Sequence, residues 1–346
     1  MMKRFSGKWR KTGVVLCMTV LWALLATGAW AATHKIDAGD LVTKLTNEVF
    51  VAAFQDGDTI EITGAPIPIP EDWGGLRANN PNAWYAFGEF NDMLWEVWEG
   101  ERGFHLKFSN GQIEIPDRAF YLEGGRLLSI SAPDVTTVGD DAFAYNENLS
   151  SVSLPKAAEI GNEAFSYCLN LRLIELGATP PTMQGGLSTF LSEWEIKEGA
   201  DRAVIVLVPD ATKYTTKLLS EYFPAGSTVN TITQGPVALT VGDALKLELT
   251  GSLPENNTRV MQWQKQDGEA WKDIAGATGA AYTKASAEAS DTGAYRLAFT
   301  TEAIKIARAA DELEEEPQPE PVTQTATAYT SPINVTVEGK ADSSVS

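Results

Sequence analysis

The residues best suited to chemistry lie in one acidic and aromatic stretch, between about residues 84 and 101. Its carboxylates are Asp92, Glu96 and Glu99, and its indoles are Trp84, Trp95 and Trp98. Carboxylates beside aromatic platforms can hydrolyse or hold sugars. Asn80 followed by Pro81 is also typical of a helix start, and a helix would direct the acids to water and pack the indoles in a core. The spacing favours the helix, so the tryptophans remain only candidate ligand-binding residues.

Few other groups in the chain could do chemistry. His34 and His105 have no Cys or His partner at metal-ligand spacing, and Cys168 lies in a repeat, where a buried structural thiol is the favoured interpretation. The sequence contains no Gly-x-Gly-x-x-Gly, Walker-type, Gly-x-Ser-x-Gly or Cys-x-x-Cys motif. We therefore expect no catalytic residue, no metal site, no cofactor and no enzymatic activity.

The net charge of the chain limits the kinds of partner that it can bind. Its 346 residues include 27 Lys or Arg and 46 Asp or Glu, which gives a net charge of -19. Such a field repels phosphate backbones and anionic lipid surfaces. We expect no nucleic-acid partner.

The first 31 residues have the layout of a secretory signal peptide. A basic segment without acids is followed by an apolar run from Val14 to Leu25 and by Ala29-Trp30-Ala31. A retained membrane anchor is the alternative, but the apolar run is short for one. We expect cleavage near Ala31, no membrane insertion afterwards, and a secreted or cell-surface location. Cys17 is then lost, and the single remaining Cys168 can form no intrachain disulfide.

The middle of the chain repeats with a period of 22 residues. Identical residues recur at this offset in the pairs Pro133/Pro155, Gly139/Gly161, Phe143/Phe165, Tyr145/Tyr167 and Leu149/Leu171. A weaker copy contains Phe120, and a partial copy begins at Leu173. Each unit predicts a short strand, near Ile130, Val152 and Ile174, and a tight return through Gly-x-x-Ala-Phe. Stacked units would bury Phe120, Phe143 and Phe165 in one continuous core.

This stretch resembles the leucine-rich repeats of BspA-like bacterial surface proteins. The shared features are an apolar strand, Pro, Ile-Gly-x-x-Ala-Phe, an aromatic residue and Leu, and the resemblance covers about residues 111 to 222. It implies a short solenoid that binds ligands or mediates adhesion without catalysis.

A different pattern begins after Gln234-Gly-Pro. Leu245, Leu247 and Leu249 alternate, Trp263 lies in Met-Gln-Trp-Gln, and the set ends in Asp291-Thr-Gly293-Ala-Tyr295. The segment is similar to bacterial immunoglobulin-like domains, in which a Trp fills the core and a Tyr after Asp-x-Gly-x bonds back to the backbone. The resemblance implies structural roles for Trp263, Asp291, Gly293 and Tyr295.

An acidic insert interrupts this second pattern after Phe299. Residues 311–320 contain six carboxylates and two prolines, which makes them too charged to pack. They could collect Ca²⁺, but they lack the residue order of a preformed calcium loop. We assign residues 304–326 to this insert and residues 331–337 to the last strand of the sandwich.

The sequence thus predicts a mixed fold with five parts. These are a signal peptide (1–31), an α/β N-terminal cap (32–110), leucine-rich repeats with a C-terminal cap (111–230), an all-β immunoglobulin-like sandwich (235–339) and a tail (340–346). The expected function is binding or adhesion to a protein or glycan ligand. A secreted carbohydrate-active protein using residues 84–101 and a structural envelope component are the alternatives.

Overall fold

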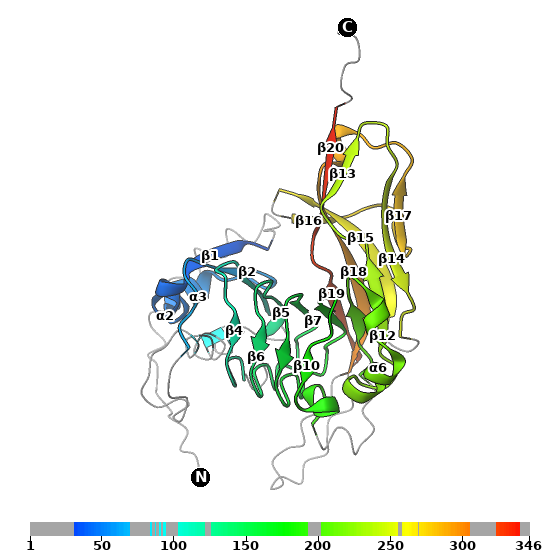
Figure 1. Ribbon diagram of the computed structural model, residues 1–346. Helices are drawn as coiled ribbons and strands as arrows, with labels where there is room; N and C mark the ends of the chain where they lie inside the picture. Colours follow the sequence, from blue (N-terminus) through cyan, green and yellow to red (C-terminus); the bar gives the residue numbers. More distant parts are fainter. Residues whose placement is uncertain are drawn as a thin grey trace, which may run out of the picture.

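The computed structural model describes residues 31–69, 84, 87, 90, 93–94, 103–121, 126–192, 202–254, 258–268, 270–304 and 323–339. A curved solenoid forms most of the N-terminal half, and an all-β C-terminal module stands at one end of it (Figure 1). The predicted signal peptide, the acidic run 311–320 and the tail lie outside the described residues.

One ten-stranded sheet runs through both parts of the molecule. Its strands, in spatial order, are β1 (Thr33–Asp37), β2 (Thr59–Thr63), β3 (Phe104–Phe108), β5 (Leu127–Ser131), β7 (Ser151–Leu154), β9 (Leu173–Leu176), β11 (Ile205–Leu207), β12 (Thr228–Ile232), β14 (Leu245–Gly251) and β17 (Ala281–Lys284). Neighbours from β1 to β12 are parallel, whereas β14 pairs antiparallel with β12 and β17. The sheet thus continues without a break from the solenoid into the C-terminal module.

The repeats stack as a ladder of phenylalanines. Each chain segment leaves the large sheet and returns through a second sheet of short parallel strands, β4 (Glu114–Ile115), β6 (Thr137–Val138), β8 (Glu159–Ile160) and β10 (Thr182–Met183). Between the two sheets, the rings of Phe120, Phe143, Phe165 and Phe190 follow one another at centroid distances of 5.3, 5.3 and 5.5 Å. These rings are almost fully buried, so each repeat completes the core of its neighbour.

The repeated glycines lie where successive units touch. A Cβ on Gly139 would lie 2.3 Å from Asp117 Oδ1, and one on Gly161 would lie 2.6 Å from the backbone nitrogen of Asp140. The same aspartates hold the units together, because Asp117 accepts a hydrogen bond from the Asp140 backbone N–H at 2.8 Å. Only glycine fits this close approach.

The N-terminal region differs from its predicted form in two ways. The helical spacing of Leu41, Leu45, Val49 and Ala53 predicts one helix with Asp40 as its cap, but the segment forms two, α2 (Leu41–Leu45) and α3 (Glu48–Ala53). Asn47 causes the break, because its side chain caps the backbone N–H groups of Val49 and Phe50, whereas Asp40 makes no side-chain cap. Val49, expected on the apolar face, is 78% exposed. The second difference is that β1 and β2 belong to the solenoid sheet itself, so this region extends the array.

The C-terminal module packs the β14–β17 pair against a six-stranded sheet. That sheet contains β13 (Val237–Thr240), β20 (Ile333–Glu338), β18 (Gly293–Ile304), β15 (Thr258–Asp267) and β16 (Ala270–Asp273), with β19 (Thr323–Tyr329) paired to β18. Trp263 lies fully buried between the two layers with Leu247 and Leu297. The Tyr295 hydroxyl donates to the backbone oxygen of Asp291 at 2.8 Å, which closes a corner at the start of β18.

The acidic insert is narrower than residues 304–326. Strand β18 extends to Ile304, and β19 begins at Thr323 and pairs with β18 in register from Ala298↔Tyr329 to Ile304↔Thr323. Residue 304 and residues 323–326, which were assigned to the insert, therefore belong to paired strands. The last strand lies where it was expected, with β20 over Ile333–Glu338 beside β18 and β13.

Helices are short in the described part of the chain. Besides α2 and α3 they include α6 (Thr216–Tyr222) and the 3-10 turns η1 (Ala38–Asp40), η2 (Gly186–Thr189), η3 (Ala211–Lys213) and η4 (Ala289–Asp291). The described residues 84, 87, 90 and 93–94 are also helical. No helix among these residues is long and apolar enough to span a bilayer.

Candidate binding surface

The tryptophan candidates do not form a ligand platform in the described residues. Trp84 is helical, 1% exposed, and packs against Phe108 and Phe120 at centroid distances of 6.2 and 5.8 Å. Its indole N–H donates to the Pro68 backbone oxygen at 3.2 Å. Neither face of this ring is open to a ligand, so Trp84 is a core residue. Trp95 and Trp98 lie outside the described residues.

The other groups singled out in the sequence have local roles. Cys168 is fully buried, and its thiol donates to the Phe143 backbone oxygen at 3.1 Å. His34 Nε2 lies 2.7 Å from Asp58 Oδ2, and the Asp58 carboxylate also accepts from two backbone N–H groups. No group of three or more His, Cys, Asp or Glu side chains in the described part of the chain is arranged to hold a metal ion.

The outer face of the large sheet, which points away from the phenylalanine ladder, carries two rows of side chains in register. The first row is Thr33, Thr59, His105, Ser129, Ser151, Leu173, Ile205 and Thr228. The second is Lys35, Glu61, Lys107, Ser131, Ser153, Glu175, Leu207 and Asn230. Both rows begin polar and contain an apolar stretch further along the solenoid, at Leu173 and Ile205 in the first row and at Leu207 in the second, before they end in Thr228 and Asn230 on β12. We call the part on β1, β2, β3 and β5 the open half, and the part on β9 and β11 the covered half.

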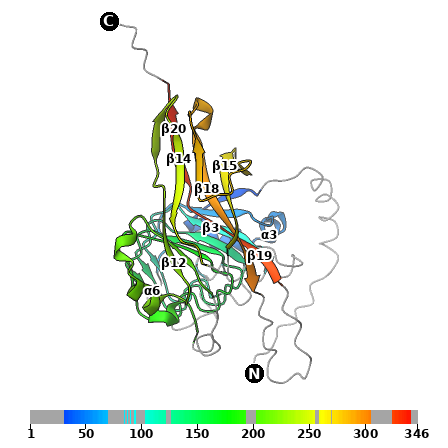
Figure 2. The same ribbon diagram turned by 90° about the vertical axis from the view of Figure 1, so that its right-hand side faces the viewer.

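The C-terminal module closes the covered half. Leu173, Ile205 and Leu207 of the solenoid are buried in the same apolar cluster as Trp263 and Leu247 of the module. Figure 2 shows β14 rising directly from the side of β12, which continues the sheet into that cluster. This half of the face is therefore a core between the two parts and presents no surface to a ligand.

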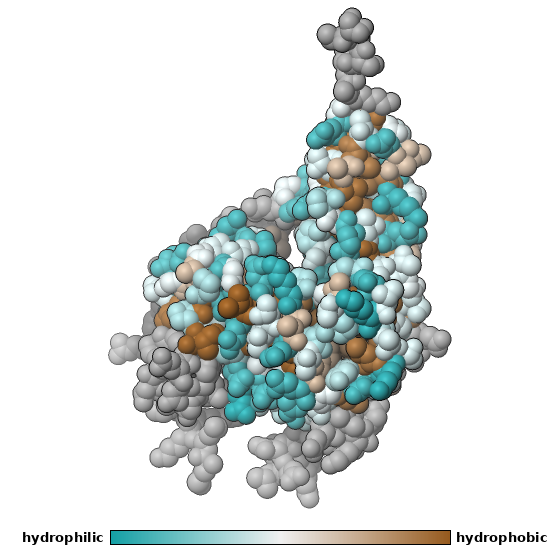
Figure 3. Space-filling view, viewed as in Figure 1, coloured by the Kyte–Doolittle hydropathy of each residue, from teal (hydrophilic) through white to brown (hydrophobic). Residues whose placement is uncertain are grey.

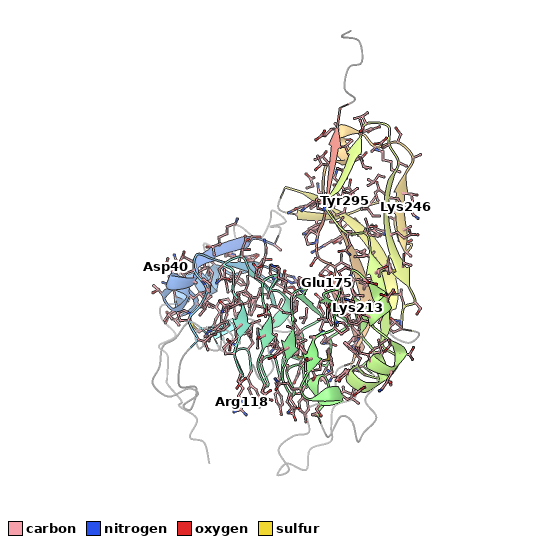
Figure 4. The ribbon with its side chains drawn as sticks, in the orientation of Figure 1. Asp40, Arg118, Glu175, Lys213, Lys246 and Tyr295 are labelled. Atoms are coloured by element: carbon pink, nitrogen blue, oxygen red, sulfur yellow. The ribbon has the colours of Figure 1, made fainter. Side chains whose placement is uncertain are left out.

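A polar seam borders the covered half. The Glu175 carboxylate accepts the Ser331 backbone N–H at 2.6 Å and the Ser331 hydroxyl, which also lies 3.0 Å from the Ser153 hydroxyl. Figure 4 shows Glu175 at the junction of the solenoid and the module. Burial raises the pKa of Glu175, and the hydrogen bonds from Ser331 and Ser153 oppose that shift. Removal from water is the dominant influence on this carboxyl group.

The open half carries charged side chains, of which the two lysines are exposed. Glu61 Oε1 accepts from Lys107 Nζ at 2.8 Å and from Ser109 Oγ at 2.7 Å, and Glu61 Oε2 lies 3.3 Å from Lys35 Nζ. Partial burial would raise the pKa of Glu61, but these hydrogen bonds and the charge of Lys107 outweigh it and lower the pKa to about 2. The side chains of Lys35 and Lys107 are 69% and 49% exposed. Two cations held by one carboxylate thus leave this half positively charged within an acidic chain.

An aromatic and cationic group of the module faces the open half. The guanidinium carbon of Arg296 lies 3.7 Å from the Tyr329 ring centroid and 4.4 Å from that of Trp271. Tyr329 in turn lies 6.3 Å, centroid to centroid, from His105 on β3, whose Nδ1 is 2.7 Å from Ser129 Oγ. Burial and the charge of Arg296 lower the pKa of His105 to about 4, so this imidazole is neutral at neutral pH. Figure 1 shows β16, which carries Trp271, on the side of the module that looks toward β1 and β2.

The remaining visible surface is mainly hydrophilic. In Figure 3 the hydrophobic residues form separate patches and no continuous apolar face. The large hydrophobic side chains that are exposed in the described part of the chain, Val49, Ile113 and Val260, belong to different elements. Recognition on the open half would therefore depend on charge, hydrogen bonds and aromatic contacts.

The family comparison agrees with the repeats seen in the fold. A family model for the BspA type leucine rich repeat region matches residues 104–190 in six copies, from the start of β3 to the last ring of the phenylalanine ladder. Residues 104–190 form a BspA-type leucine-rich repeat region. The match begins earlier than residue 111, because β3 already belongs to the array.

Other comparisons add no further relationship. No curated protein matches the chain. Among solved structures, the endo-beta-1,4-mannanase from Thermotoga petrophila is aligned over 90% of this chain and 98% of its own, with 7% identity and a TM-score of 0.18. A score this low carries no argument about fold or function.

Proposed function

We propose that this protein is a secreted or cell-surface binding protein without catalytic activity, and that it recognises a protein or glycan ligand on the open half of the solenoid. One observation carries the proposal. The same face of the same sheet is apolar at Leu173, Ile205 and Leu207, which pack in the core of the module, and is charged and exposed at Lys35 and Lys107. The BspA-type repeats support a role in adhesion.

The C-terminal module, in this proposal, is an immunoglobulin-like domain. Three features support that assignment. Trp263 on β15 fills the space between two packed sheets, the Tyr295 hydroxyl bonds back to Asp291, and the strands divide into a β14–β17 pair and a sheet containing β15, β18 and β20. The hairpin of β18 and β19 then lies before the last strand and brings Tyr329 against the solenoid.

The alternatives have less support. A carbohydrate-active site near residues 84–101 loses one of its three indoles, because Trp84 is buried among Phe108 and Phe120. A purely structural envelope component would give no reason for an exposed charge network beside an aromatic cluster. An assay for reducing sugar released from polysaccharides, with Glu96→Ala and Glu99→Ala as controls, tests the first alternative.

Binding of residues 32–346 to glycan and matrix-protein arrays tests the proposal. We expect at least one ligand whose affinity falls tenfold or more in the double variant Lys35→Gln/Lys107→Gln. The matched control is Lys156→Gln/Lys217→Gln, which removes two solenoid charges outside the open half and should leave binding unchanged. No array ligand, or equal losses in both double variants, would contradict the proposal.

A further inference from the structure

Arg296 is held in an unusual setting for a cation. Trp271 and Tyr329 lie over its guanidinium group, and its Nε donates to Gln264 Oε1 at 2.7 Å. No ion pair joins Arg296 to a carboxylate among the residues that the structure describes. Burial lowers its pKa to about 10, against the opposing charges of Tyr329 and Asp273. The side chain is therefore desolvated and oriented, but it lacks a bound counter-charge.

The geometry leaves one part of this group for a ligand. The aromatic rings occupy the guanidinium face and Gln264 takes Nε, so the edge formed by Nη1 and Nη2 remains. That planar edge matches the two oxygens of a carboxylate. Trp271 and Tyr329 are only partly buried, and their rings offer apolar surface of the kind that packs on a sugar ring.

We propose that Arg296 binds the carboxylate of an acidic sugar residue and that Trp271 and Tyr329 pack on its ring, with the sugar lying toward the open half near Lys107 and Ser129. This inference rests on the proposed function and names the ligand class for it. The shared chemistry is a single carboxylate on a hydroxylated ring, as in a uronyl or a sialyl group.

The surrounding charges favour an acidic sugar over an acidic peptide. Lys35, Lys107 and Arg296 are opposed by Glu61 and Asp273, so the local excess of positive charge is small. One carboxylate among hydroxyl groups suits that excess. A run of carboxylates would meet Glu61, Asp273 and the field of a chain with net charge -19.

Titration of residues 32–346 with four probes tests the inference. Sialyllactose and a glucuronyl disaccharide each carry one carboxylate, lactose is the neutral counterpart, and pentaglutamate is the peptide source of carboxylates. The variants are Arg296→Gln, Arg296→Lys, which keeps the charge but loses the planar edge, and Trp271→Leu. Lys246→Gln, an equal loss of charge on β14, is the control. Thermal melts verify that each variant is folded.

We expect one of the acidic sugars to bind at least tenfold more tightly than lactose, and which one binds identifies the source of the carboxylate. Both Arg296 variants and Trp271→Leu should weaken that binding tenfold or more, and Lys246→Gln should not. Equal binding of lactose, tighter binding of pentaglutamate, wild-type affinity in Arg296→Lys, or no binding of either acidic sugar would each overturn the inference. If an array ligand still depends on Lys35 and Lys107 but not on Arg296, the proposed function stands and this inference fails. If no array ligand exists, both fail.

Discussion

Glu61 and Glu175 occupy the same row of the same sheet and have opposite surroundings. Glu61, on the open half, contacts two lysines, and its pKa is lowered to about 2. Glu175, at the covered half, is removed from water beneath Ser331, and its pKa is raised. The backbone geometry is shared, so the difference comes from what lies over each carboxylate. One face of a solenoid thus serves as an interface at one end and remains a surface at the other.

The largest loss of stability is expected for Trp263→Ala in the module, and this variant tests whether the covered half shares a core with the module. We expect a loss of about 3–5 kcal/mol, because the change empties the centre of the cluster that includes Leu173 and Leu207 of the solenoid. Since one sheet passes through both parts, calorimetry should show one transition that moves to lower temperature as a whole. Val260→Ala, at an exposed position of β15, is the control. A solenoid transition that stays in place while a second one shifts would show that the covered half is no shared core.

A second test compares the two halves within one row. Leu207→Ala should cost about 2–5 kcal/mol, because it leaves a cavity between solenoid and module. Ser131→Ala, in the same row on the open half, should change stability by less than about 0.5 kcal/mol. Urea denaturation of both variants measures the difference, and equal costs would remove the distinction between the halves.

The sequence predicted the repeats because their signal is local and periodic. The 22-residue offset predicted strands near Ile130, Val152 and Ile174, and these strands are β5, β7 and β9. The short motifs around Trp263 and Tyr295 likewise predicted a core residue and a corner residue of the module. Strands β1 and β2 carry no copy of the repeat, so their membership of the solenoid sheet was not predictable from it.

The candidate site itself was missed for a different reason. Lys35, Glu61 and Lys107 lie on separate strands, and only strand register brings them together. Glu175 and Ser331 are 156 residues apart and belong to different parts of the fold. The sequence signal for this face was the alternation of polar and apolar residues within single strands, as in Thr59-Ile-Glu-Ile-Thr63. Such alternation shows which residues lie on the outer face, but it does not show which residues of other strands lie beside them.

A smaller effect is expected when each carboxylate loses one hydroxyl partner. Ser331→Ala should cost about 1–3 kcal/mol, because water cannot readily replace the hydroxyl group beside the buried Glu175. Ser109→Ala removes a comparable bond to Glu61 on the open half, where water is accessible, and should cost less than about 0.5 kcal/mol. Chemical denaturation at neutral pH measures both, and a larger loss for Ser109→Ala would reverse the assignment of the two halves.

The smallest expected effect is a difference in how the stability contributed by each carboxylate depends on pH. Lowering the pKa of Glu61 from 4.5 to about 2 makes its contribution to stability present above pH 4.5 and lost as the pH falls toward 2. The pKa of Glu175 is raised from 4.5, so its contribution is present below pH 4.5 and is lost as the pH rises through the folded-state pKa.

The two glutamine variants should therefore diverge from the parent protein in opposite directions. The stability of Glu61→Gln relative to the parent should be lowest at neutral pH and recover as the pH falls below 4.5. For Glu175→Gln, stability relative to the parent should instead increase with pH. In the parent the buried carboxyl group resists ionisation, which costs the folded state stability as the pH rises, whereas the glutamine side chain has no charge to gain. Denaturation curves at several pH values between 3 and 8 measure both differences. Parallel profiles for the two variants would mean that Glu175 is as well solvated as Glu61, and that the seam beneath Ser331 is open to water.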